Sequence, residues 1–390
     1  MRRKTHEVKI GKLRIGGDNK VAVQSMTTCS TMDTEGCIEQ CIRIIDAGAD
    51  LVRLTTQGTR EAENLRNIKA GLIERGYGDT PLCADVHFNP NVADVAATIV
   101  EKVRVNPGNY VDPARQFKQL EYTDEEYEAE LQRLDERFCH FLSICRQHGT
   151  AIRIGVNHGS LSDRIMSRYG DTPSGIVESC MEFLRICERE QFPDVVVSIK
   201  ASNTVVMVQS VRLLCQEMER EGMDYPLHLG VTEAGEGEDG RLKSAVGMGG
   251  LLIDGIGDTI RVSLSEEPEN EIPVAQSILQ AARVQMSKTE FISCPGCGRT
   301  LYDLQDTIRR VKTAVQERAK HDPRYNTLKI AIMGCIVNGP GEMADADYGY
   351  VGAARGKVSL YKNKECVEKN IPEAEAVEHL LQLIENEAPL

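Results

Sequence analysis

The sequence predicts an α/β fold, a (β/α)8 TIM barrel followed by a small α+β domain. Over about the first 265 residues, eight short runs rich in β-branched residues alternate with longer helical patterns. Eight regular strand–helix units are typical of a closed barrel. After a charged linker the pattern changes to a shorter mixture of strands and helices around two glycine-rich loops that contain cysteine. This change indicates a second, smaller domain.

The predicted strands of the barrel are short and apolar. They lie at residues 21–26, 51–56, 81–86, 103–106, 151–157, 195–202, 226–232 and 259–265. The helical patterns between them include residues 34–47, 60–74, 92–100, 172–190, 202–221 and 241–252. A long amphipathic helix is predicted over 123–149, because Leu134, Phe138 and Phe141 recur at helical spacing. A doubly wound sheet is the alternative, but eight regular units fit barrel closure better.

A charged segment with two prolines, residues 265–273, separates the two predicted domains. We therefore expect a substrate-binding barrel over residues 1–268 and a second domain over residues 269–390. The second domain is predicted to contain helices at 274–286, 301–320 and 372–387, a strand at 327–334, and a hairpin of 348–354 and 357–362.

Composition excludes several classes of protein. The formal net charge of −13 argues against nucleic acid as a partner. No apolar run approaches the ~18 residues that a membrane span needs, so we expect no membrane association. The thirteen cysteines are dispersed, and many lie in apolar segments where a free thiol acts as a small hydrophobic group. A reducing, cytoplasmic location is therefore expected.

Basic side chains lie inside five of the eight predicted strands, at Arg53, Arg104, Arg153, Lys200 and Arg261. Helices cover the strands of a barrel, so a buried cation there is costly unless an anion neutralises it. Arginine also matches phosphate oxygens with paired hydrogen bonds. We therefore predict a polyanion pocket at the C-terminal mouth of the barrel, most simply for a diphosphate, to which Asn106 and Asn157 add neutral donors.

Two carboxylates share the predicted mouth, Asp85 and Glu233. A carboxylate beside bound phosphate has a raised pKa, which favours a role as a general acid. The alternative is that each carboxylate only pairs with the arginines. We favour the ion pair for Asp85, and both interpretations stay open for Glu233, the candidate acid.

Three cysteines lie in two glycine-rich loops of the second domain. Cys294 and Cys297 are two residues apart in a Pro/Gly-rich turn, and Cys335 lies about forty residues further on. No histidine is near enough in the sequence to complete a zinc tetrahedron, and Glu342 is the nearest oxygen donor. Three thiolates with a weak fourth ligand suit an iron–sulfur cluster with one exchangeable iron. Structural zinc and a plain disulfide are the alternatives.

The motifs CPGCGR and MGCIVNGPGE follow a barrel that bears VQSMT, ADVHFNP, RVNPGN, IRIGVNHGSL, SIKAS and LGVTEAG. In these motifs the chain resembles the 4-hydroxy-3-methylbut-2-en-1-yl diphosphate synthase family of isoprenoid biosynthesis. The resemblance implies a 4Fe–4S cluster held by Cys294, Cys297, Cys335 and Glu342. It also implies that the five strand-borne cations bind a diphosphate, with Asn157 and Ser263 nearby.

The resemblance implies a reaction as well. The family reductively opens and dehydrates 2-C-methyl-D-erythritol 2,4-cyclodiphosphate to 4-hydroxy-3-methylbut-2-enyl diphosphate, with single electrons from ferredoxin or flavodoxin. A displaceable carboxylate at Glu342 suits this chemistry better than a fourth thiolate, because one iron must be open to the departing oxygen. Under this hypothesis Glu233 supplies the proton as water leaves.

The long helix before the fifth predicted strand departs from the simplest form of the family. The long helix at 124–147 resembles that of a longer, three-domain form, yet the interval between Ser265 and Cys294 is too short for an extra domain. Two-domain members act as head-to-tail dimers, so we expect a homodimer. Two other classes stay open: a barrel hydrolase or aldolase with a structural zinc module, and a non-catalytic iron–sulfur sensor that binds a phosphorylated effector.

Overall fold

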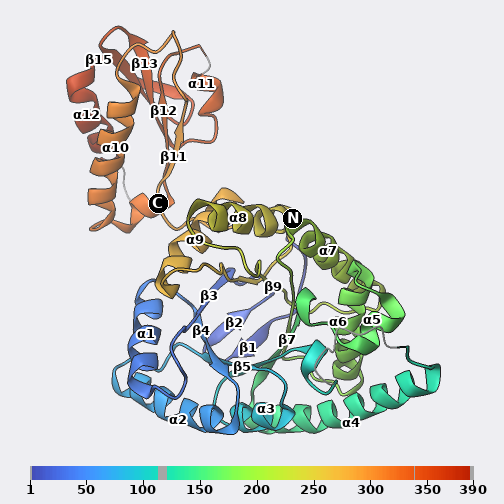
Figure 1. Ribbon diagram of the computed structural model, residues 1–390. Helices are drawn as coiled ribbons and strands as arrows, with labels where there is room; N and C mark the ends of the chain where they lie inside the picture. Colours follow the sequence, from blue (N-terminus) through green and yellow to red (C-terminus); the bar gives the residue numbers. More distant parts are fainter. Residues whose placement is uncertain (1, 113–120, 338, 387–390) are drawn as a thin grey trace. The chain divides into compact units, whose positions relative to one another are not determined.

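The structure is a computed structural model that describes residues 2–112, 121–337 and 339–386. The chain divides into two compact units, Met1–Gln285 and Met286–Leu390 (Figure 1). Within the described ranges, no helix is long and apolar enough to cross a membrane.

Eight parallel strands form the barrel of the first unit. They are β3 (Ala22–Met26), β4 (Leu51–Thr56), β5 (Leu82–Val86), β6 (Lys102–Val105), β7 (Ala151–Asn157), β8 (Val195–Lys200), β9 (His228–Leu229) and β10 (Thr259–Ile260). Strands β3 to β8 pair in chain order, and β10 pairs with both β3 and β9. A bridge between Val197 and Leu227 joins β8 to the segment before β9. The sheet is thus nearly closed on itself, which confirms the predicted (β/α)8 barrel.

Helices surround the strands on the outside of the barrel (Figure 1). They are α1 (Thr34–Asp46), α2 (Thr59–Glu74), α3 (Pro90–Ala97), α4 (Asp124–His148), α5 (Asp163–Tyr169), α6 (Pro173–Arg189), α7 (Thr204–Arg220), α8 (Gly237–Ile253) and α9 (Glu271–Ala281). Side chains cap several of them; Asp33 accepts a hydrogen bond from the backbone of Gly36 in α1, and Asn203 caps α7 in the same way.

Helix α4 is the long helix that the sequence predicts. Thr123 and Glu126 form a reciprocal capping box at its start, and Gly149 ends it with a φ of 66°, a conformation that favours glycine. Its buried face carries Leu134, Phe138 and Phe141, which join the main barrel core. Helix α4 is therefore held by the same apolar packing as the shorter barrel helices.

A hairpin precedes the barrel and was not predicted. Strands β1 (Val8–Ile10) and β2 (Leu13–Ile15) pair antiparallel. Their apolar side chains form a separate cluster with Leu51, Ala151 and Val196, which lie at or next to the first residues of their strands. The hairpin therefore covers the N-terminal end of the barrel, opposite the end where the predicted site lies.

Helix α9 belongs to the first unit. Its residues Ile272, Ala275 and Ile278 join the barrel core, so α9 is the eighth barrel helix. The sequence-based boundary after residue 268 and the predicted helix at 274–286 had assigned this segment to the second domain. The two compact units instead divide between Gln285 and Met286.

The second unit contains a five-stranded mixed sheet in the order β11-β12-β13-β14-β15. Its strands are β11 (Glu290–Ser293), β12 (Lys329–Met333), β13 (Tyr348–Ala354), β14 (Lys357–Lys362) and β15 (Glu365–Pro372). Helices α10 (Leu304–Ala319) and α12 (Glu373–Glu385) contribute Val311, Val315 and Leu380 to a core shared with the sheet. The predicted hairpin is β13–β14, whereas β11 and β15 were not predicted.

Candidate functional site

Basic side chains line the inside of the barrel. Successive side chains of a strand point to opposite faces, so every second position faces inward. Arg53 on β4, Arg104 on β6 and Arg153 on β7 are 9%, 3% and 1% exposed, and the strand register sets Arg104 directly beside Arg153. Lys200 is the last residue of β8, and Arg261 follows β10. The structure therefore brings the five predicted cations together inside one barrel.

Two carboxylates neutralise part of this charge. Asp85 on β5 accepts a hydrogen bond from Nη1 of Arg104 at 2.9 Å and lies 3.5 Å from Nη2 of Arg53. Glu271, the first residue of α9, accepts hydrogen bonds from Nε and Nη2 of Arg261, both at 3.1 Å. The ion-pair interpretation of Asp85 is thus the arrangement in the structure. Among the described residues, these two carboxylates balance only part of the positive charge of the five predicted cations, so the interior keeps an excess of positive charge.

The excess charge changes the acidity of the buried cations. Burial, followed by repulsion from Arg53 and Arg104, lowers the pKa of Arg153 to about 9. Burial and then repulsion, mainly from Arg153, hold the pKa of Lys200 well below its ordinary value. An anion among these groups would oppose both effects, because a nearby opposite charge favours the protonated form. The barrel interior therefore carries an excess of positive charge, which a nearby anion would relieve.

The predicted neutral donors lie at or just after the C-terminal ends of the strands. The Asn106 side chain donates to Oγ of Ser160 at 2.8 Å and accepts from the backbone N–H of Gly108 at 3.2 Å. Asn157 ends β7, and Ser263 is half-buried in the segment after β10. Asn106 thus supports the mouth loops, whereas no hydrogen bond engages the Asn157 or Ser263 side chain within the described part of the chain.

Glu233 lies in the loop that follows β9. It is exposed and has a φ of 47°, in the left-handed region that few non-glycine residues adopt. Strain of this kind is often found at functional sites, although turns also produce it. Glu233 thus lies in the loop at the mouth side of the barrel, and its side chain has no hydrogen-bond or ion-pair partner among the described residues.

Sequence reasoning missed several residues that shape the barrel interior. Glu271 was assigned to the linker, and Lys102 was overlooked although it stands two positions before Arg104 and therefore faces the same side. Gly155 and Gly230 were also missed. A methyl group at Gly155 would lie 2.6 Å from Nε of Arg104, and one at Gly230 would lie 2.7 Å from Nζ of Lys200. These glycines leave room for the cations, and alternation along β7 was the signal that could have identified Gly155.

A second candidate site lies in the C-terminal unit. Cys294, Cys297, Cys335 and Glu342 line one cavity of about 370 Å³. Cys297 and Glu342 are exposed, whereas Cys294 and Cys335 are partly buried. Among the described residues, no three Cys, His, Asp or Glu side chains are arranged to hold a single metal ion. The four predicted ligands thus surround a space rather than one point.

Backbone hydrogen bonds hold the two cysteine loops together. The Leu301 N–H donates to the carbonyl of Gly334 at 3.2 Å, and the Gly334 N–H donates to Sγ of Cys294, also at 3.2 Å. Within the first loop, Oγ1 of Thr300 accepts from the Cys297 N–H at 3.0 Å. Residue 338 of the second motif lies outside the described residues. The loops are therefore fixed to each other through Gly334.

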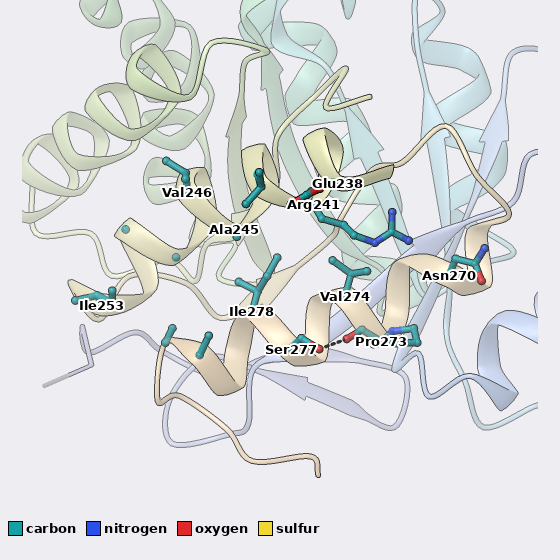
Figure 2. Close-up of a pocket in the computed structure, with 15 residues that line it drawn as sticks. Glu238, Arg241, Ala245, Val246, Ile253, Asn270, Pro273, Val274, Ser277 and Ile278 are labelled. Carbon is teal, nitrogen blue, oxygen red and sulfur yellow. Dashed lines mark hydrogen bonds between the residues drawn. The ribbon is translucent and has the colours of Figure 1, made fainter. Parts of the chain in front are cut away.

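Another cavity of the first unit lies between α8 and α9. It has a volume of about 930 Å³ and is lined mainly by apolar groups. Figure 2 shows Val246 and Ile253 on α8 and Val274 and Ile278 on α9 along this groove. Because the groove lies on the outer helices, it is separate from the cationic interior of the barrel.

Fold and sites together define a TIM-barrel protein with a cationic interior and a C-terminal α+β domain that carries three clustered thiols. The GcpE TIM-barrel domain matches residues 5–276, and the GcpE protein C-terminal domain matches residues 290–386. The chain therefore belongs to the GcpE family, which confirms the resemblance found in the sequence.

Curated relatives of the chain share one activity in their names. The chain is 45% identical to 4-hydroxy-3-methylbut-2-en-1-yl diphosphate synthase (flavodoxin) of Phocaeicola vulgatus, over 98% of this chain and 97% of that protein. It is 49% identical to 4-hydroxy-3-methylbut-2-en-1-yl diphosphate synthase (ferredoxin) of Trichormus variabilis, over 98% of this chain and 92% of that protein. The first alignment spans 606 positions and the second 384. Since 606 exceeds the 390 residues of this chain, the Phocaeicola relative contains residues with no counterpart here.

Proposed function

We propose that this protein is an oxidoreductase that reductively opens and dehydrates 2-C-methyl-D-erythritol 2,4-cyclodiphosphate to 4-hydroxy-3-methylbut-2-enyl diphosphate. The observation that carries the proposal is the combination of two sites in one chain of the GcpE family. One site is the cationic barrel, which suits a cyclic diphosphate, and the other is the thiol-lined cavity, which suits a redox centre. The family match favours this reaction over a zinc-containing barrel enzyme or a non-catalytic sensor.

The cavity of the C-terminal unit fits an iron–sulfur cluster in size and chemistry. A cavity of about 370 Å³ is much larger than a single zinc ion requires, and thiolates are the ligands that such clusters prefer. The Gly334 N–H donates a hydrogen bond to Sγ of Cys294, so the backbone of the second loop directly contacts one of the proposed thiol ligands. We infer that Cys294, Cys297, Cys335 and Glu342 would hold a 4Fe–4S cluster. Such a cluster supplies single electrons and a Lewis-acidic iron when bound.

The barrel residues would hold the substrate. Arg53, Arg104, Arg153, Lys200 and Arg261 would bind the diphosphate, with Asn157 and Ser263 as additional donors. Asn106 would act mainly by supporting the loop that ends at Ser160. Their role is to orient the ring and neutralise the phosphate charge, since charge-assisted hydrogen bonds are about twice as strong as neutral ones. Glu233, at the mouth side, would donate the proton to the departing oxygen.

The partners and location follow from the same proposal. Ferredoxin or flavodoxin would deliver the electrons, as the names of the relatives state for those proteins. Nucleic acid is not expected as a partner of a chain with a net charge of −13. All thirteen cysteines are free, which supports a reducing compartment and hence the cytoplasm.

We also propose a homodimer, formed through the groove between α8 and α9. Leu242, Val246 and Ile253 are 54%, 65% and 73% exposed along this groove (Figure 2). Contiguous exposed apolar surface is typical of an interface, and a symmetric dimer would cover the same face on both copies. Val246→Lys should shift the mass measured by light scattering from dimer to monomer, whereas Val205→Lys, an equally exposed change on α7, should not.

An anaerobic assay with a strong artificial reductant tests the main proposal. Purified holoenzyme should be brown, should contain iron and sulfide, and should consume the cyclic diphosphate while forming the dehydrated product. Colourless protein that contains zinc without sulfide would establish a structural metal module instead. Binding of the cyclic diphosphate without turnover under these conditions would establish a sensor.

A further inference from the structure

Lys102 is a fully buried lysine that none of the proposed functions uses. It is the first residue of β6, it is 0% exposed, and its Nζ has no hydrogen-bond partner among the described residues. A buried ammonium group without a partner is costly, and lysine is almost never fully buried unless it is paired. Such a residue requires an explanation.

Lys102 lies inside the barrel beside Ala151 on β7, at the level of the apolar cluster under the β1–β2 hairpin. Strand pairing sets it beside Cys83 on β5, and the charges of Arg53 and Arg153 act on it from β4 and β7. Other atoms of this interior also lack partners within the described ranges: Nε and Nη1 of Arg153 and Nε2 of His228. Further ionisable groups of this interior, among the described residues, are Asp85, Arg104, Lys200, Arg261 and Glu271.

Within the part of the chain that the structure describes, no carboxylate compensates the charge of Lys102. Asp85 is engaged by Arg104 and Arg53, and Glu271 is engaged by Arg261. His228, whose pKa is held well below its ordinary value by burial and then by Lys200, adds no negative charge. The charge of Lys102 is therefore unbalanced as long as the barrel holds no anion.

We propose that Lys102 is a positioning residue that takes up a proton when a polyanion occupies the barrel mouth, so that its ammonium group adds to the field that holds the phosphates. This inference rests on the proposed diphosphate site and deepens it. The proton comes from solvent and is returned when the anion leaves.

The direction in which pH changes anion binding follows from the linkage between anion binding and protonation of Lys102. Burial, together with repulsion from Arg153 and Arg53, lowers the pKa of Lys102 to about 7, with Cys83 acting in the opposite direction. Above pH 7 the free protein therefore holds this amine mainly neutral, and an anion that raises the pKa causes proton uptake. Binding then weakens as pH rises above 7, by up to about tenfold per pH unit for one proton. Lys200 is expected to add a contribution of the same sign.

Calorimetric titration with methanedisulfonate tests the proposal, because this disulfonate resembles a diphosphate but has no titratable group near neutral pH. Affinity is measured from pH 6 to 9 for the holoenzyme, for Lys102→Met and for Lys102→Arg, with the exposed Lys20→Met as the control. Buffers with different ionisation enthalpies report the protons taken up.

In wild-type protein and in Lys20→Met, the affinity for methanedisulfonate should fall with the same slope as pH rises above 7. Lys102→Met should have a shallower slope, by up to one proton, because methionine does not titrate. Lys102→Arg should also have a shallower slope, because the ordinary pKa of arginine is higher than that of lysine. Lys102→Met should bind about tenfold more weakly than wild type at pH 6 and converge with it at pH 9. Equal slopes and equal proton uptake in all four proteins would overturn the inference. Failure of the wild type to bind the disulfonate at any pH would instead contradict the proposed barrel site.

Discussion

Asp85 and Arg104 form a hydrogen-bonded ion pair inside the barrel, with 2.9 Å between Oδ1 and Nη1 and both residues buried. Burial alone would raise the pKa of Asp85, but the charges of Arg53 and then Arg104 outweigh it and hold the pKa well below the ordinary value. Nη2 of Arg104 also donates to the carbonyl of Gly155 at 2.7 Å. Asp85 therefore fixes one of the proposed substrate-binding cations in place.

Asp85→Asn should destabilise the protein by about 3 kcal/mol at pH 7, because it leaves Arg104 with an uncompensated buried charge. The pKa of Asp85 in the folded protein is depressed. Its contribution to the free energy of unfolding is therefore fully present above the ordinary carboxyl pKa of about 4, and it is lost as pH falls through the pKa of the folded protein. Urea unfolding followed by circular dichroism measures the effect, since the chain has no tryptophan. The exposed Asp79→Asn, which removes a surface pair with Lys12, should change stability by less than about 1 kcal/mol. Equal effects in the two variants would contradict this role.

Gly155→Ala should weaken substrate binding without removing any charge. The new methyl group would lie 2.6 Å from Nε of Arg104 and 3.1 Å from Oγ of Ser198, so the guanidinium must move away from its position beside Asp85. We expect a rise in KM of roughly tenfold, the loss of about one good hydrogen bond. Gly159→Ala is the matched control, because nothing lies within 4 Å of its added methyl group. An unchanged KM for Gly155→Ala would show that the position of Arg104 is unimportant.

Arg153→Ala tests whether the barrel cations hold the diphosphate. Each lost charge-assisted contact costs on the order of 1.5–3 kcal/mol, so KM should rise roughly ten- to a hundredfold or turnover should disappear. The visible spectrum of the cluster should stay normal, because Arg153 lies in the other compact unit. Arg185→Ala, on the exposed side of α6, serves as the control. If KM is the same in both variants, the substrate binds elsewhere.

Cys335→Ser should lose most of the brown absorbance and the activity, since Cys335 is a proposed cluster ligand. Cys366 lies on β15, where its thiol donates to the Glu368 carbonyl at 3.6 Å, and it does not line the cavity. Cys366→Ser should therefore keep iron, sulfide and turnover close to wild-type levels. Iron and sulfide analysis under anaerobic conditions measures the difference, and equal losses in both variants would refute the ligand assignment.

Glu342 is the proposed ligand that substrate must replace. Glu342→Ala should leave one iron without its protein ligand, so the cluster should become more sensitive to oxygen and activity should collapse. Glu342→Cys should retain the cluster spectrum but lose turnover, because a thiolate is a much stronger ligand for iron than a carboxylate. Near wild-type turnover of Glu342→Cys would mean that exchange at this position is not part of catalysis.

Sequence patterns located most barrel elements to within a few residues, but they failed where the chain leaves the regular pattern. Residues 226–232 and 259–265 were predicted as full strands, yet β9 and β10 contain only two residues each. The apolar residues of these two segments are buried near the mouth of the barrel, but most of them do not take part in regular strand pairing. The predicted boundary after residue 268 lies in the charged, proline-containing segment of the sequence, whereas residues Ile272, Ala275 and Ile278 of α9 pack in the barrel core.

The amino-acid sequence by itself determined which residue types were available for chemistry: cations within apolar strands, and three cysteines in glycine-rich loops. These signals are local, since they depend on spacing and on neighbours along the chain. Only the tertiary structure decided how the charges are balanced. Glu271 forms an ion pair with Arg261. It also accepts a hydrogen bond from Ser25, which lies 246 residues earlier in the chain, because α9 packs against the first strand of a nearly closed barrel. Whether a buried cation such as Lys102 has a partner likewise depends on which side chains the closed barrel brings into its interior. The periodicity of residues along the chain does not predict this.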